Sequence, residues 1–122
     1  MKDNINDFIN AYIDCALWSS FETDLPEALY SLDDISPSCK QTMHDDCVDF
    51  LESFGNLIDQ AIALNLGYDS SKAGHDFWLT RNGHGAGFWD RSLGDIGDEL
   101  TTVTKHYGSC ELYVGDDGLI YC

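Results

Sequence analysis

The sequence predicts an α+β fold in a single domain covering residues 1–122. Residues 1–67 carry apolar side chains at the 3.6-residue period of helices, together with most of the negative charge. Residues 68–122 are richer in glycine and contain short aromatic runs that are typical of strands. We therefore expect two N-terminal helices followed by a ββαββ unit, whose antiparallel sheet has helices packed on it.

The two N-terminal helices are predicted from apolar periodicity and from their start signals. Over residues 5–17 the apolar side chains recur on one face of a helix. The second helix is expected to start at Ser36 and Pro37, a capping residue followed by the residue favoured at the first helical position, and to stop at Gly67. A short helical turn is expected at residues 25–27, where a proline lies in the first turn.

The C-terminal half is predicted to hold two hairpins and one helix. The expected strands are residues 77–81, 88–91, 110–114 and 119–121. The glycine-rich segments 82–87 and 115–118 would make the two turns. A helix is expected over residues 93–107, with Ser92 and Asp95 forming a capping box at its start.

The charge of the chain excludes some partners and favours others. There are 22 acidic residues against 6 basic ones, a formal net charge of -16. Residues 1–71 hold 14 of the acidic residues and only 2 lysines. Direct binding to nucleic acid or to an anionic membrane needs clustered Lys and Arg, so neither is expected. A basic protein is the favoured partner, and a nucleic-acid-binding host protein would be one such partner.

The cysteine pattern and the apolar content favour a cytoplasmic protein with reduced thiols. The chain has five cysteines, an odd number, and no Cys-x-x-Cys pair. Its first residues lack the basic and apolar regions of a signal peptide. No apolar run approaches the roughly 20 residues that a membrane span needs.

Acidic residues form a ridge along the predicted second helix. Asp45, Asp49, Glu52 and Asp59 share one face and span about 21 Å, with few cations available to pair with them. The ridge can be a solvated face, a decoy for a nucleic-acid-binding protein, or a surface for another basic partner. We expect the partner-binding residues to be Asp45, Asp49, Glu52 and Asp59, with Asp3, Asp7 and Asp14 on the first helix as a second set.

The Gly/His/Arg stretch 74–91 is the alternative site. Glycine amides with nearby cations can hold an anion, and its histidines and aspartates are suitable metal ligands. Its spacing matches no metal or phosphate-loop template, so no metal, cofactor or catalytic residue is predicted, and a plain hairpin explains it as well. The candidate ligand-site residues are His75, Asp76, Arg81, His84, Asp90 and Arg91.

Three stretches together resemble a group of small acidic proteins encoded by bacteriophages and prophages: residues 15–20, 74–91 and 113–121. The resemblance implies an intracellular protein made in the cytoplasm of an infected bacterium, and it raises the expectation of an inhibitor. We therefore predict a non-enzymatic protein that binds a basic host or phage protein through its acidic helical face, with a DNA-mimic inhibitor as the specific form. The alternatives are a small ligand-binding or metal-binding domain or enzyme built on residues 74–91, and a structural or assembly subunit.

Overall fold

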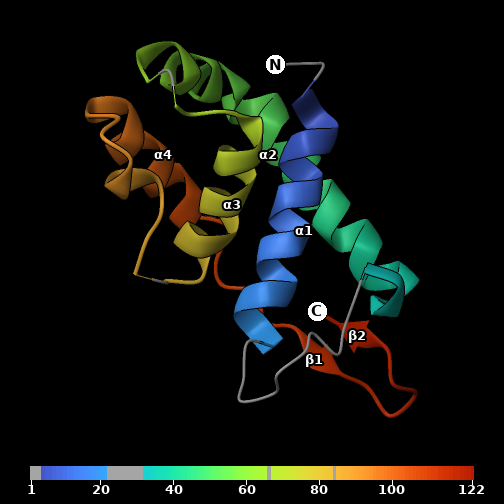
Figure 1. Cartoon of the computed structure of the whole chain (residues 1–122). Helices are drawn as coiled ribbons and strands as arrows, with labels where there is room; N and C mark the ends of the chain where they lie inside the picture. Colours follow the sequence, from blue (N-terminus) through green and yellow to red (C-terminus); the bar gives the residue numbers. More distant parts are fainter. Residues whose placement is uncertain (1–3, 22–31, 66, 84) are drawn as a thin grey trace.

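The computed structural model describes residues 4–21, 32–65, 67–83 and 85–122 (Figure 1). Its elements are α1 (Ile5–Phe21), η2 (Leu32–Asp34), α2 (Pro37–Leu64), α3 (Ser70–Arg81), η3 (Phe88–Asp90), α4 (Asp95–Lys105), β1 (Tyr113–Val114) and β2 (Ile120–Tyr121). Asp3, His84 and the turn expected at residues 25–27 lie outside the described residues.

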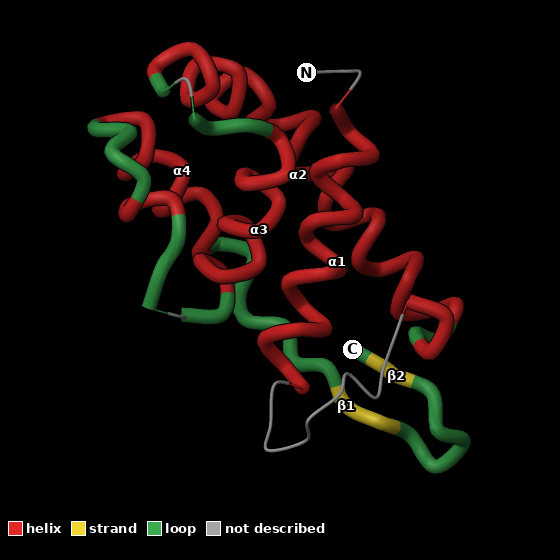
Figure 2. The backbone as a smooth tube through the Cα atoms, in the orientation of Figure 1, coloured by secondary structure: helices red, strands yellow, loops and turns green. Residues whose placement is uncertain are grey.

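The expected α+β class with a ββαββ unit is wrong, because the described chain is mostly helical (Figure 2). The only sheet among the described residues is the two-stranded pair β1–β2. Residues 77–81, expected as a strand, belong to α3, and residues 88–90 form the short helix η3. No described helix combines the length and apolar character needed to cross a bilayer.

A run of six consecutive buried residues, 76–81, explains why the sequence favours a strand where the structure has α3. A segment that is buried at every successive position shows no amphipathic period, and the open side of α3 is limited to Ser71, Lys72 and the half-buried His75. The aromatic residues of this segment favour strands by propensity, yet tertiary packing overrides such preferences. The helix has a local start signal, since the Asp69 side chain accepts a hydrogen bond from the Lys72 backbone N–H at 2.8 Å. The buried residues of α3 are Ser70, Ala73, Gly74, Asp76, Phe77, Trp78, Leu79, Thr80 and Arg81.

The core forms where α1 and α3 pack against each other and on α2. Gly74 allows the two helices to approach closely, since a Cβ at this position would lie 2.1 Å from the backbone oxygen of Phe8. Aromatic rings fill the centre, with the Phe50 and Phe77 ring centroids 4.3 Å apart and Tyr12 and Phe77 at 5.1 Å. Such stacked and tilted pairs stabilise a core beyond their burial of apolar area.

The expected start of α2 is confirmed, but the helix ends earlier than expected. The Ser36 hydroxyl accepts a hydrogen bond from the Cys39 N–H at 3.2 Å, and Pro37 is the first helical residue. The helix stops at Leu64, three residues before Gly67, and Asn65 caps it.

The start of α4 differs from the expected capping box. Its N-cap is Gly94, with a φ of 59°, and no side chain caps the helix. The serine and aspartate of the predicted box therefore do not form it, because a left-handed glycine turns the chain into the helix instead.

The C-terminal hairpin is confirmed as an antiparallel pair, with Tyr113 opposite Tyr121. It is attached to the start of α2, where the Ser36 N–H donates to the Ile120 carbonyl at 2.8 Å. A disulfide joins Cys39 to Cys122, with their Cα atoms 5.4 Å apart. The structure departs from the expectation of reduced thiols at two of the five cysteines, because chain packing brings together residues that are 83 positions apart.

Candidate functional site

The first candidate site is a row of carboxylates on α2, which we call the α2 acidic stripe: Asp45, Asp49, Glu52 and Asp59. All four residues are exposed, as their helical spacing predicts. Two of them are oriented by neutral donors, since the Tyr107 hydroxyl donates to Asp49 at 2.5 Å and the Gln41 amide donates to Asp45 at 2.8 Å. Neutral donors hold these carboxylates in place without cancelling their charge.

Both arginines of the chain are bound to carboxylates outside the stripe. Arg81 pairs with Asp46 at 2.9 Å, and Arg91 pairs with Asp76 at 2.8 Å. In the described part of the chain, no ion pair with a lysine or arginine involves Asp45, Asp49 or Glu52. The negative potential of the stripe is therefore not offset by the arginines.

Arg81 lies in the core, away from the other predicted ligand-site residues. Its guanidinium donates to the Tyr12 hydroxyl at 2.9 Å and to the backbone oxygens of Tyr107 and Gly108 at 3.1 Å and 2.8 Å. With its Asp46 pair, these bonds join α1, α2, α3 and the end of α4. The predicted ligand role of Arg81 is thus replaced by a structural one.

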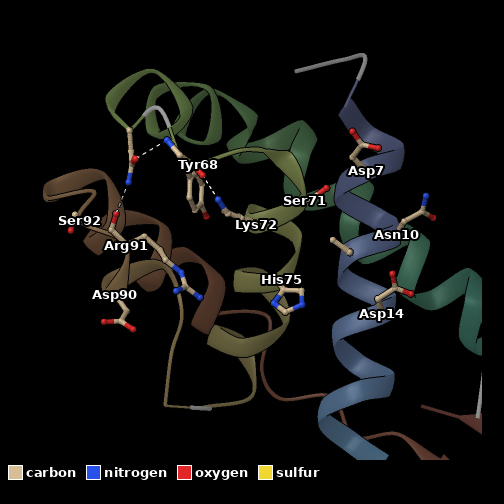
Figure 3. A pocket seen from close by; sticks show the side chains of 13 residues that line it. Asp7, Asn10, Asp14, Tyr68, Ser71, Lys72, His75, Asp90, Arg91 and Ser92 are labelled. Atoms are coloured by element: carbon tan, nitrogen blue, oxygen red, sulfur yellow. Dashed lines mark hydrogen bonds between the residues drawn. The ribbon is translucent and has the colours of Figure 1, made fainter. Parts of the chain in front are cut away.

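The second candidate site is a cavity of about 780 Å³, which we call the α1–α3 cleft (Figure 3). Residues Asp7, Asn10 and Asp14 of α1 form one wall, and Asp90, Arg91 and Ser92 form the other. Lys72 and His75 of α3 lie between the walls. The structure thus brings His75, Asp90 and Arg91 of one predicted set together with Asp7 and Asp14 of the other. No residue of the stripe lines this cleft.

A buried hydrogen-bond network beneath the cleft fixes Arg91. The Asp76 side chain is fully buried and accepts bonds from the Tyr68 hydroxyl at 2.8 Å and from Nε and Nη2 of Arg91 at 3.0 Å and 2.8 Å. Two parallel bonds hold a guanidinium in a defined orientation. Asp76 is occupied by these donors, so the structure gives it a positioning role in place of the predicted ligand role.

The metal alternative finds no support in the described geometry. In residues 4–21, 32–65, 67–83 and 85–122, no group of three His, Cys, Asp or Glu residues could hold an ion. The described residues of the expected glycine-rich anion loop, 82–83 and 85–87, do not line the cleft either.

The described free cysteines are poor nucleophiles. Burial raises the pKa of the Cys15 thiol to about 12, with a further contribution from the nearby Asp76 carboxylate. Burial also raises the pKa of Cys47 and of Cys110. A raised thiol pKa lowers the thiolate fraction that reacts.

Sequence reasoning missed Tyr68, Lys72 and Asn10 as cleft residues. The signal that could have found one of them, Lys72, is the cap at Asp69. A helix starting there places Lys72 and His75 three residues apart on one face. The contribution of α1 has no such local signal, because it depends on how α1 packs on α3.

Stability is expected to fall steeply above pH 10. Burial raises the pKa of Tyr12 and of Tyr68 above the ordinary value of 10.0, and Asp76 raises that of Tyr68 further. Below pH 10 both phenols are protonated in the folded and unfolded chains alike. Above it the unfolded chain alone releases these protons, which favours unfolding by about 1.4 kcal/mol per pH unit for each tyrosine.

Urea unfolding followed at several pH values above 10 measures this slope. Tyr68→Phe should reduce it by about 1.4 kcal/mol per pH unit, whereas Tyr113→Phe on the exposed hairpin should leave it unchanged. Equal slopes for the wild type and Tyr68→Phe would contradict the assignment.

The described surface thus holds two candidate sites of different character. The α2 acidic stripe carries one sign of charge, and the α1–α3 cleft carries both. No protein-family model, curated protein or solved structure matches this chain.

Proposed function

We propose that the chain is a non-enzymatic protein that binds a basic partner protein through the α2 acidic stripe. The single observation that supports this most directly is that the two arginines pair with carboxylates outside the stripe. Both are bound to Asp46 and Asp76, so neither arginine offsets the negative charge of the stripe. A net charge of -16 would also speed the approach of a positively charged surface.

The specific form of the proposal is a DNA-mimic inhibitor of a nucleic-acid-binding protein. Carboxylates on successive turns of a helix are about 6 Å apart, which approximates the separation of phosphates along one DNA strand. The stripe extends over about 21 Å of a helix that Ser36 caps. The hydrogen bond from Tyr107 to Asp49 favours a defined position for one carboxylate of the row.

The proposed setting is the host cytoplasm, in keeping with the resemblance to phage-encoded proteins. Cytosolic disulfides are rare, so the Cys39–Cys122 bond would be reduced there. The proposal therefore requires that the helical core folds without this bond. The core supports that requirement, because the rings of Phe8, Phe50 and Phe77 join α1, α2 and α3 through contacts that involve neither cysteine of the disulfide.

The test compares two variants with the same change in charge. One removes the stripe by D45N, D49N, E52Q and D59N. The other removes four exposed carboxylates elsewhere by D33N, E99Q, E111Q and D116N. Each variant and the wild type are immobilised and exposed to bacterial lysate, and bound proteins are eluted with rising salt and, separately, with duplex DNA.

We expect the wild type and the control variant to retain the same DNA-binding proteins, and the stripe variant to lose them at least tenfold. Duplex DNA should displace them, because DNA and the stripe would compete for one surface. Equal retention by the stripe variant would refute the proposal. If salt elutes the bound proteins but duplex DNA does not, the result would support a basic partner and contradict the DNA-mimic form of the proposal.

A further inference from the structure

The α1–α3 cleft contains an anion anchor. Asp76 holds Nε and Nη2 of Arg91, whereas Nη1 donates to no acceptor in the described part of the chain. The Arg91 side chain is 33 % exposed, and it lines the cleft. A guanidinium that is already oriented by a buried carboxylate binds a second carboxylate at little entropic cost.

Further donors lie beside this anchor. His75 is half-buried, lines the cleft and has no hydrogen-bond partner among the described residues. The Lys72 ammonium donates to the Gly67 carbonyl, which ties this side chain to the cleft rim. The hydroxyls of Ser71 and Ser92 also line the cavity.

The opposite wall attracts cations. Asp7, Asn10 and Asp14 recur at helical spacing on α1, and a separation of seven residues places the two aspartates about 10 Å apart along the helix. Both carboxylates are exposed and line the cleft, and α1 contains no lysine or arginine to neutralise them.

The charges of the cleft define its ligand. Asp76 offsets Arg91, so Asp7, Asp14 and Asp90 outnumber Lys72 among the remaining charged groups of the described cleft lining. A fitting ligand therefore carries one anionic group for Arg91 and a larger positive charge for α1. The cavity of about 780 Å³ is within the range of small-molecule sites.

We propose that the α1–α3 cleft binds a free basic amino acid. Its carboxylate lies against Arg91 and His75, and its cationic side chain extends along α1 to Asp7 and Asp14. The proposal is independent of the α2 acidic stripe, because the stripe residues do not line this cavity.

Calorimetric titration of the full chain with L-arginine tests the proposal, with two matched probes. Agmatine has the guanidinium of arginine without its carboxylate, and citrulline has the carboxylate with a neutral side chain of similar size. We expect each to bind at least tenfold more weakly than arginine. The affinity of agmatine relative to arginine is decisive, because agmatine has the larger net positive charge. Non-specific attraction to an acidic protein would therefore make agmatine bind more tightly than arginine.

Variants of the cleft residues test the contribution of each wall to binding separately. The pair Asp7→Asn and Asp14→Asn should weaken arginine binding at least tenfold and leave citrulline binding unchanged. His75→Ala should weaken both arginine and citrulline, and Asp45→Asn on the stripe should change neither. The proposal is overturned if arginine does not bind at millimolar concentration, if agmatine binds as well as arginine, or if the double variant binds arginine like the wild type.

Discussion

Asp76→Ala is expected to lower the free energy of unfolding by about 3 kcal/mol. The substitution removes the acceptor of hydrogen bonds from three donor groups, and it leaves the Tyr68 hydroxyl and the Arg91 guanidinium without their shared partner. Breaking a buried pair on one side costs about 3–5 kcal/mol. The lower end applies because Arg91 is partly exposed and can turn toward water.

Urea unfolding measures this loss, and Asp90→Ala is the matched control. Asp90 is an exposed carboxylate next to Arg91 in sequence, so its removal should change stability by no more than about 0.5 kcal/mol. A loss for Asp76→Ala as small as that of the control would show that the buried network contributes little.

Gly74→Ala is expected to lower stability by about 2 kcal/mol, which reverses the usual effect of this change. In a helix interior, replacing glycine by alanine normally stabilises by about 0.5–1 kcal/mol. Here the new methyl group would overlap the backbone oxygen of Phe8, which cannot rotate away as a side chain would. Helices α1 and α3 would have to separate, and overpacking of this kind typically costs about 1–3 kcal/mol.

Thermal and urea unfolding of Gly74→Ala are compared with those of Gly85→Ala. A Cβ at position 85 would meet no atom within 4 Å, so this control should be near neutral. A stability of Gly74→Ala at or above that of the wild type would contradict the close approach of the two helices.

The helices that were predicted correctly each bury one side. In α1, α2 and α4 the buried residues recur at helical spacing, and the opposite side is polar, so the period is visible in the sequence. Helix α3 lacks this contrast over residues 76–81, which are all buried, and its Phe77 and Trp78 then favour a strand by propensity. The cap at Asp69 was the local signal against a strand, and the aromatic run outweighed it.

The two candidate sites also differ in how far they could be predicted from the sequence. The α2 acidic stripe depends on spacing within one helix, so its four residues could be predicted from the sequence. The α1–α3 cleft depends on the packing of segments that are far apart in the chain. Arg81 and Arg91 illustrate this, since they lie ten residues apart yet bind Asp46 of α2 and Asp76 of α3 on different sides of the fold. No local pattern separates these two roles.

The pairing of α1 with α3 imposes an order of events on the ribosome. Phe21 ends α1 and Arg81 ends α3, 60 positions later. At about 5–20 residues per second, translation of that interval takes roughly 3–12 s. Until then the apolar side of α1, with Phe8, Ile9 and Tyr12, has no α3 to cover it. During that interval this apolar face is exposed to other chains and can misassociate.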